Sequence, residues 1–358
     1  MVDEIVIHLG DCKTGTTSIQ SVLAAGAWES DAGDICYPAR FNHIPLAKTL
    51  TMPGETDKQE KRFTKLRRRM DQSDAAHGVV SAEHFEFVDP ELLHDALQRH
   101  LPGYMSRIRL IAYVRPHADR LLSSFAERNK KGRFMKSLPA LHDVMLANGK
   151  LLYAPRFRKW RAVFGDSFTL RPFLRDQLYQ GDVVQDFFRF VLGSRDFRIT
   201  RDVDRNRSLS VEDIAMLRAF HRVFRAQDHA LKDQQKAFGW FMSNDLSERP
   251  DPGATRPRLH RALAERVVEA YRADAMALDA EFFDGTPMQD ALEAAPGKAA
   301  EQPQSFAPED HFSAAEIRRY EALAAFLKHL IESDPRHFLW AVRPEEQRRA
   351  EPPRDSET

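Results

Sequence analysis

HLGDCKTGTTSIQ, from His8 to Gln20, follows a short apolar run and precedes a helical pattern. The run at residues 5–7 is β-branched, Gly10 and Gly15 interrupt the stretch, and a helix is expected from Thr16 onward. This order predicts a strand, a tight turn and a helix N-terminus. A helix start presents backbone amides and the positive end of a dipole, so the turn is suited to an anion such as a phosphate.

Side chains of the same stretch add donors to the backbone. Lys13 adds a positive charge, and hydroxyls come from Thr14, Thr16, Thr17 and Ser18. A Walker A loop has the order G-x-x-x-x-G-K-[ST], with the lysine after the second glycine. Here Lys13 precedes Gly15, so the Walker spacing fails. The stretch therefore predicts a phosphate-binding loop of another type.

The order K-T-G-T-T-S resembles the 5′-phosphosulfate-binding loop of sulfotransferases that use 3′-phosphoadenosine-5′-phosphosulfate (PAPS). More narrowly, the start resembles bacterial members of that superfamily, in which a strand runs into H-x-G-x-x-K-T-G-T-T-S-[IL]-Q. The sequence matches from His8 to Gln20, with Asp11 and Cys12 at the variable positions. The resemblance implies that the cofactor is held at Gly10, Lys13, Thr14, Gly15, Thr16, Thr17 and Ser18.

A second strand-to-helix unit lies in RIRLIAYVRPHADRLLSSF, Arg107 to Phe125. The apolar run 110–114 is of the parallel-strand type, Arg115 stands at its carboxyl end, and Pro116 suits a first helical turn. Arg115 and Ser123 are eight residues apart, roughly 12 Å along a helix. Because the arginine side chain is long and lies just outside the helix, the guanidinium and the hydroxyl are expected to converge on one anion.

This unit resembles the 3′-phosphate-binding motif of the same superfamily, a strand followed by R-x-P-x-x-R-x-x-S or a near variant. Arg115-Pro116 stands where many relatives have Arg-Asp-Pro, so the turn is one residue shorter and Ser124 is an alternative to Ser123. An ion-paired arginine and a capping serine would be the purely structural alternative. Together, the two motifs fit the two phosphate ends of PAPS, whereas ATP and GTP lack the 3′-phosphate.

GVVSAEHFEFV, Gly78 to Val88, supplies the candidate general base. Val79 and Val80 indicate a buried strand, and Glu83 and His84 follow its carboxyl end, where ligands bind in open parallel sheets. The segment resembles the S-x-E stretch after the second core strand of many sulfotransferases, where an acidic residue or a histidine takes the acceptor proton. Helix capping by Glu83 and packing of His84 are the structural alternatives.

Composition limits the other function classes. The 358 residues contain 53 Lys and Arg against 53 Asp and Glu, so no global field attracts nucleic acid or an anionic membrane. The two cysteines, Cys12 and Cys36, have no metal-ligand spacing. The chain starts without a signal-like segment, and no run reaches the roughly 18 apolar residues of a membrane helix. These features favour a soluble, cytoplasmic protein without a metal.

The sequence predicts one α/β domain at residues 1–283, a three-layer parallel β-sheet with flanking helices (the P-loop NTPase-like sulfotransferase fold), with helical additions at the C-terminus. Residues 284–312 are expected to be a linker, 313–342 a helix packed on the domain, and 343–358 a disordered tail. Loops are also expected at 243–257 and 284–311, and helices at 151–163 and 183–192.

Two further segments yield weaker predictions. Arg40 and His43 lie in a loop and are weak candidates for binding the acceptor, with a solvated loop and a helix cap as the alternatives. Residues 206–210 resemble an N-x-S-L-S stretch that bacterial relatives have near the cofactor, and Ser210 alone is explained as a helix N-cap.

The resemblance implies a PAPS-dependent sulfotransferase that transfers a sulfuryl group to a hydroxyl or amine of a glycan, a glycolipid or a small molecule, leaving adenosine 3′,5′-bisphosphate. Glu83, with His84 in reserve, would accept the acceptor proton, and Lys13 would neutralise the departing phosphate oxygen without a metal. The alternatives are a P-loop-type kinase, which predicts Mg²⁺ dependence, and a catalytically silent nucleotide-binding protein of the same fold. The acceptor and the oligomeric state stay open.

Overall fold

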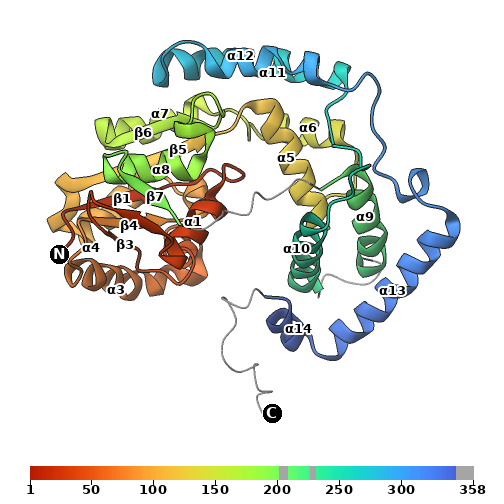
Figure 1. The fold of residues 1–358 in the computed structure, drawn as a ribbon, viewed down its shortest axis with the longest axis horizontal. Helices are drawn as coiled ribbons and strands as arrows, with labels where there is room; N and C mark the ends of the chain where they lie inside the picture. Colours follow the sequence, from red (N-terminus) through yellow and green to blue (C-terminus); the bar gives the residue numbers. More distant parts are fainter. Residues whose placement is uncertain (201–208, 226–230, 344–358) are drawn as a thin grey trace. The chain divides into compact units, whose positions relative to one another are not determined.

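The computed structural model describes residues 1–200, 209–225 and 231–343 (Figure 1). The chain divides into two compact units, each made of three segments. The first unit contains residues 1–117, 150–205 and 271–292, and the second contains residues 118–149, 206–270 and 293–358. The boundaries expected at 283 and 312 stay a prediction. No helix within the described ranges is both long enough and apolar enough to cross a membrane.

The first unit is built on a five-stranded parallel sheet with the order β3-β4-β1-β5-β6. Its strands are β1 Glu4–His8, β3 Ile35–Cys36, β4 His77–Ser81, β5 Ile108–Val114 and β6 Phe168–Pro172. β4 and β5 lie on either side of β1 over nearly its whole length. The carboxyl ends of the three strands therefore meet at one edge of the sheet.

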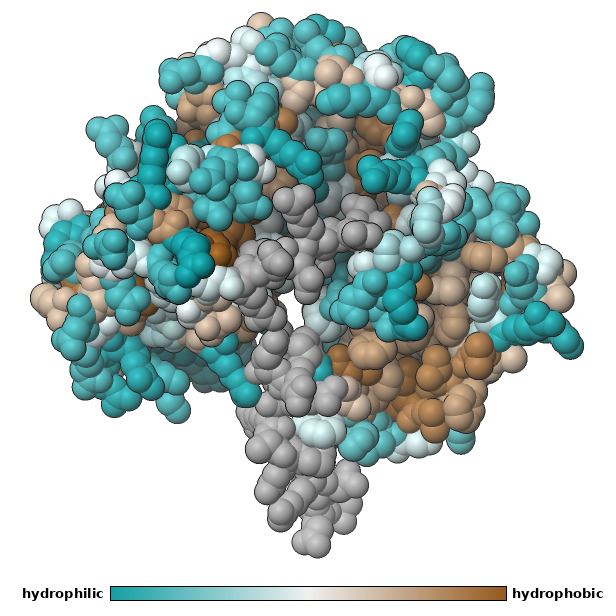
Figure 2. Space-filling model, viewed as in Figure 1, coloured by the Kyte–Doolittle hydropathy of each residue, from teal (hydrophilic) through white to brown (hydrophobic). Residues whose placement is uncertain are grey.

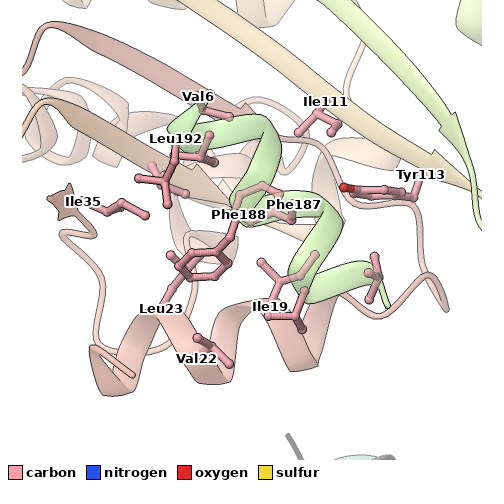
Figure 3. Close-up of a cluster of buried hydrophobic side chains, with 14 of the residues drawn as sticks. Val6, Ile19, Val22, Leu23, Ile35, Ile111, Tyr113, Phe187, Phe188 and Leu192 are labelled. Carbon is pink, nitrogen blue, oxygen red and sulfur yellow. The ribbon is translucent and has the colours of Figure 1, made fainter. Parts of the chain in front are cut away.

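Helices cover both faces of this sheet. Those of the first unit are α1 Thr16–Ala25, α2 Ile44–Lys48, α3 Gln59–Asp71, α4 Pro90–His100, α7 Ala154–Phe164, α8 Val183–Leu192 and α12 Pro287–Glu293. Side chains of α1 and α8 form one buried layer against alternate strand residues, such as Val6 and Ile111 (Figure 3). α3, α4 and α7 bury Phe63, Leu97 and Trp160 in the layer on the other face. The predicted three-layer α/β fold with a parallel sheet is confirmed.

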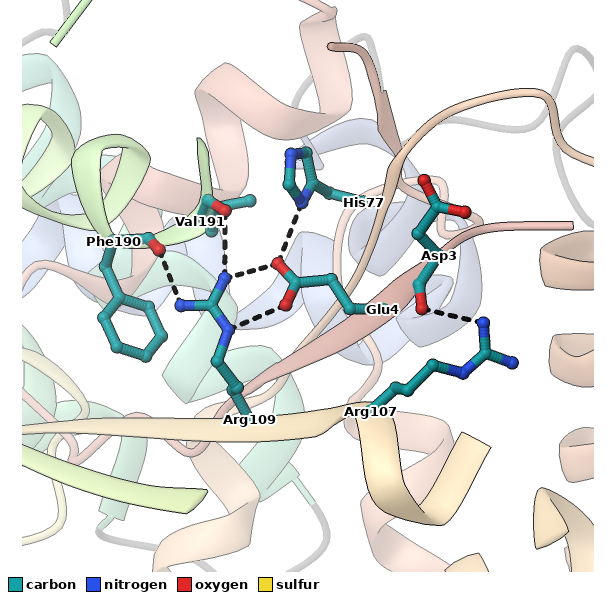
Figure 4. Close-up of polar contacts among 7 residues, drawn as sticks. All are labelled: Asp3, Glu4, His77, Arg107, Arg109, Phe190 and Val191. Atoms are coloured by element: carbon teal, nitrogen blue, oxygen red, sulfur yellow. Dashed lines mark hydrogen bonds and ion pairs between the residues drawn. The ribbon is translucent and has the colours of Figure 1, made fainter. Parts of the chain in front are cut away.

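A half-buried ion-pair network joins strands β1, β4 and β5 to helix α8 at the amino-terminal end of the sheet (Figure 4). Glu4 of β1 accepts from His77 Nδ1 of β4 at 2.9 Å and from Arg109 Nε of β5 at 2.8 Å. Arg109 also donates to the carbonyls of Phe190 and Val191 in α8. Burial opposes the charge of Glu4, but these hydrogen bonds lower its pKa to about 2. The network fixes the register of the strands at the end opposite to the ligand edge.

The second unit is helical. Within it lie α6 Leu138–Ala147, α9 Val211–Arg225, α10 Lys232–Glu248, α13 Ala314–Ser333 and α14 Pro335–Ala341, while α5 His117–Lys130 and α11 Arg261–Phe282 cross the boundary between the units. Of these, α13 and α14 are the C-terminal helical additions that the sequence predicts. Hydrophilic residues cover most of the face in Figure 2, with a hydrophobic area where Figure 1 draws α13 and α14.

The two helices predicted in the middle of the chain are both present. The helix predicted at 183–192 is α8, with the same bounds. The helix expected at 151–163 starts at residue 154, because Asp274 accepts hydrogen bonds from the amides of Tyr153 and Ala154. The expected N-cap at Ser210 is confirmed by the bond from the Asp213 amide to Ser210 Oγ.

Two expected loops are partly helical, so those predictions were wrong. α10 continues to Glu248, and within it Ser247 Oγ bonds back to the carbonyl of Ser243 at 2.6 Å. α12 forms inside the expected loop at 284–311 because Asp279 of α11 accepts from the amides of Met288 and Gln289. This cap comes from a neighbouring helix, so no local pattern announces it.

A β2–β7 pair, Trp28–Ser30 with Phe197–Ile199, forms a separate antiparallel ribbon in the first unit. The N-x-S-L-S interpretation begins at Asn206, Arg207 and Ser208, which lie outside the described residues.

Candidate functional site

The candidate site lies at the carboxyl edge of β4, β1 and β5. The loop from residue 9 to 15 connects β1 to α1, and its backbone is left-handed at Gly10 (φ 81°), Lys13 (φ 71°) and Gly15 (φ 79°). This conformation is routine for glycine and uncommon for lysine. A non-glycine residue held in it is a frequent sign of a functional loop. The predicted strand, turn and helix N-terminus are all present.

Gly15 is the N-cap of α1 and has no side chain with which to cap the first turn. A Cβ at this position would lie 2.5 Å from Val183 Cγ1, so close packing also requires glycine here. No side chain of Gly15 therefore covers the backbone amides at the N-terminus of α1, which lies next to Lys13 in the chain. Amides and a lysine at a helix start form a site for an anion.

The four hydroxyl residues of the loop are placed differently. Thr14 and Thr16 are buried, and their hydroxyls donate to the carbonyl of Asp11, at 2.6 and 3.5 Å. Thr17 is exposed and Ser18 is half-buried on the first turn of α1. Thr14 and Thr16 thus hold the shape of the loop, and Thr17 and Ser18 remain at the surface of the helix start.

Glu83 packs its backbone against the loop. It begins the 3₁₀ turn η2 Glu83–Phe87, which follows β4, and a Cβ placed on Gly10 would lie 2.7 Å from Glu83 Cα. Only glycine allows this approach. His84 is half-buried and stands edge-on to the ring of Phe87, with 5.9 Å between ring centroids. Of the two candidate bases, Glu83 has its main chain directly against the loop.

Arg115 follows β5 and reaches the same edge. Its guanidinium carbon lies 4.7 Å from the centre of the Phe173 ring. The same ring lies 3.4 Å from the position of a Cβ on Gly15. Phe173 therefore has Arg115 and the N-terminus of α1 as neighbours. Ser123 and Ser124 are half-buried on α5, in the segment that belongs to the second unit, so their pairing with Arg115 stays a prediction.

Two acidic residues, Asp11 and Glu86, hold the loop between β1 and α1 in place. Asp11 is 2% exposed, and its carboxylate receives both terminal nitrogens of Arg156 at 3.0 and 3.1 Å. Burial opposes the charge of Arg156, but Asp11 and Glu86 raise its pKa. Glu86 Oε2 also accepts from the amide of Cys12 at 3.0 Å. These contacts hold the tip of the loop in place.

The sequence did not single out Asp11, Glu86, Arg156 or Phe173. Asp11 stands at a variable position of the motif, and Arg156 is 145 residues away from it. Glu86 has a detectable signal, since it follows Glu83 by one turn in the same polar cluster. Arg156 and Phe173 have no local signal, because their roles depend on where α7 and β6 lie against the loop.

A buried polar network supports the strand ends. Ser81 Oγ bonds to His8 Nδ1 at 2.9 Å and accepts from Gln20 Nε2 at 3.0 Å. His43 Nδ1 accepts from the amide of Ser81 at 3.1 Å. Burial lowers the pKa of His8 to about 3 and that of His43 to about 4, so both rings are neutral near pH 7. His43 is thus buried in the framework, Arg40 is exposed, and acceptor binding by either stays a prediction.

The chain matches no protein-family model. No curated protein is similar to it at a significant level. Among solved structures, the sulfotransferase from Alicyclobacillus acidocaldarius is similar over 81% of this chain and 100% of that one, with 15% identity and a TM-score of 0.45. A likeness of this size establishes neither a family nor an activity for this chain.

Proposed function

We propose that this chain transfers a sulfuryl group from PAPS to a hydroxyl or amine of a glycan, glycolipid or small-molecule acceptor. One observation carries the proposal. Lys13, Glu83 and Arg115, which the sequence motifs single out, follow the three adjacent parallel strands β1, β4 and β5 on the carboxyl side of the sheet. A cation at a helix start, a carboxylate and a second cation are the groups that this reaction needs there.

The residues of the loop are suited to the phosphosulfate end of PAPS. When bound, PAPS supplies the activated sulfuryl group and leaves as adenosine 3′,5′-bisphosphate. The amides at the start of α1 hold the 5′-phosphate, and Lys13 neutralises the charge that develops on its departing oxygen. Lysine and amide dipoles take the role that Mg²⁺ has in nucleoside-triphosphate chemistry.

Glu83 acts as the general base in this proposal. Its carboxylate accepts the proton that the acceptor hydroxyl gives up as its oxygen bonds to sulfur. His84, the next residue, is the other candidate. Arg115, with Ser123, binds the 3′-phosphate, so that binding energy at one end of the nucleotide orients the sulfur at the other.

Calorimetric titration tests the proposal. Adenosine 3′,5′-bisphosphate and, separately, ATP with Mg²⁺ are titrated into the wild type, Lys13→Ala and Arg115→Ala. Losing one charged contact to a phosphate costs about 1.5–3 kcal/mol, so each variant should bind the bisphosphate at least tenfold more weakly. Lys58→Ala and Arg198→Ala, which remove exposed cations of the same unit, are the matched controls.

Metal-independent binding of the bisphosphate that weakens in Lys13→Ala and Arg115→Ala supports the proposal. It also justifies a screen of acceptors with PAPS, in which sulfated product is measured. Preference for ATP with Mg²⁺, or bisphosphate binding that is indifferent to Arg115, contradicts it and favours a kinase.

A further inference from the structure

A cavity of about 440 Å³ in the second unit has an unusual lining. Its walls are formed by Met135, Arg218, Arg222, Arg225 and Ala307. The three arginines stand at positions i, i+4 and i+7 of α9, so they share one face of the helix. Like charges at this spacing repel each other. Among the described residues that line the cavity, none is acidic.

Arg218 is the buried member of the three. It is 7% exposed, and it donates to Asn129 Oδ1 at 2.6 Å, to the carbonyl of Lys136 at 2.8 Å and to that of Phe306 at 3.3 Å. The rings of Phe125 and Phe306 lie 5.5 and 5.6 Å from its guanidinium carbon. All these partners are neutral, and within the described part of the chain no carboxylate pairs with Arg218.

A buried charge without a counter-charge destabilises a fold. Here burial, together with the nearby charge of Arg222, lowers the pKa of Arg218 to about 10. The side chain nevertheless remains charged near pH 7. The three neutral oxygens satisfy its hydrogen bonds but leave its net charge in place. An anion in the cavity would supply the missing charge.

The other two arginines are exposed. Arg222 forms a two-point ion pair with Glu309. The bond to Arg222 lowers the pKa of Glu309 to about 2, so this carboxylate is ionised. Glu321 also lies close enough to raise the pKa of Arg222. Glu309 thus occupies Arg222 in the absence of a ligand, and a bound anion would compete with it.

We propose that this cavity binds the sulfate or phosphate group of a small organic ester. Guanidinium groups bind tetrahedral oxyanions through paired, charge-assisted hydrogen bonds, which suits three arginines on one helix face. The volume lies in the range of small-molecule sites, so it leaves room for a group of the size of a sugar beside the anion. The cavity shares no residue with those named for the proposed sulfuryl transfer.

Titration of the full-length protein with glucose 6-sulfate and glucose 6-phosphate tests the site, with inorganic sulfate, inorganic phosphate and glucose as further probes. No nucleotide is present, so the result does not depend on the transfer reaction. Arg222→Gln and Arg225→Gln should each weaken binding about tenfold. Glu309→Gln should strengthen it about threefold, because it removes the competing carboxylate. Arg261→Gln, which breaks another exposed arginine–glutamate pair of the unit, is the control.

Ester binding with this pattern of variants supports the proposal. Equal affinity for the inorganic ions and the esters supports the anion site and shows that its ligand is the free ion. The proposal is overturned if no probe binds saturably, if glucose binds as well as its esters, or if Arg225→Gln binds like the wild type. Arg218 is left intact, because its three hydrogen bonds also hold the fold.

Discussion

Cationic side chains lie both at the loop before α1 and in the arginine cavity of α9, but the two regions differ in whether a carboxylate pairs with the buried arginine. Beneath the loop, Arg156 pairs with Asp11 through two hydrogen bonds, and Glu86 accepts the amide of Cys12. In the cavity, the hydrogen bonds that Arg218 donates within the described residues all go to neutral oxygens. The acidic residues around the loop thus balance its buried arginine, whereas an external anion would balance the charge in the cavity.

The largest expected effect concerns turnover at the loop. If Glu83 is the base, Glu83→Gln should lower the rate of sulfuryl transfer by about 10²–10⁴, the usual contribution of a positioned general base. Glu29→Gln, which changes an exposed carboxylate of the same unit, should leave the rate unchanged. Product formation from PAPS is measured across an acceptor screen. A similar loss in His84→Gln, with Glu83→Gln fully active, would reverse the roles of the two residues.

The next largest effect is expected on stability, from the ion pair of Asp11 with Arg156 that holds the loop. Asp11→Asn removes the carboxylate that Arg156 is hydrogen-bonded to and should lower the free energy of unfolding by about 3 kcal/mol. Asp245→Asn breaks the exposed pair with Arg249 in the second unit and should cost less than about 1 kcal/mol. Urea unfolding of both variants gives the two values. If both variants lose the same small amount of unfolding free energy, the pair of Asp11 and Arg156 does not stabilise the loop, and the proposed difference between the loop and the cavity fails.

The smallest effect concerns the histidines under the strand ends. Burial lowers the pKa of His43 to about 4, so the unfolded chain binds its proton first as the pH falls below 6.5. His8 behaves in the same way, and so does His221 of the second unit. Each should contribute a loss of up to about 1.4 kcal/mol per pH unit between about 6.5 and 4.5.

Denaturant unfolding at pH 7, 6 and 5 measures this slope. His43→Gln should reduce it, and His329→Gln on the exposed face of α13 should not. The lowered pKa of Glu4 affects stability mainly below about pH 4.5, outside this window. If the pH dependence of the unfolding free energy is the same in His43→Gln as in the wild type, the ring of His43 is not held neutral in the folded protein.

The loop and the strand ends of the candidate site could be predicted from the sequence, because they depend on residues that are adjacent in the chain. The β-branched run, Gly10 and Gly15 predict the strand, the turn and the helix start, and each depends on local backbone preference. The strand ends at Ser81 and Val114 follow in the same way, which places Glu83 and Arg115 after them. The helix at 183–192 is equally local, since its apolar residues repeat with helical spacing.

The strand–turn–helix units and the residues that follow each strand can therefore be predicted from local sequence. The positions of β4 and β5 on either side of β1, the pairing of Arg156 with Asp11 and the capping of α12 by Asp279 depend on tertiary packing. Tertiary packing also places Arg218 of α9 among neutral oxygens. The physical reason is that backbone conformation depends on adjacent residues, whereas a charge partner or a cap comes from whichever distant segment packs alongside.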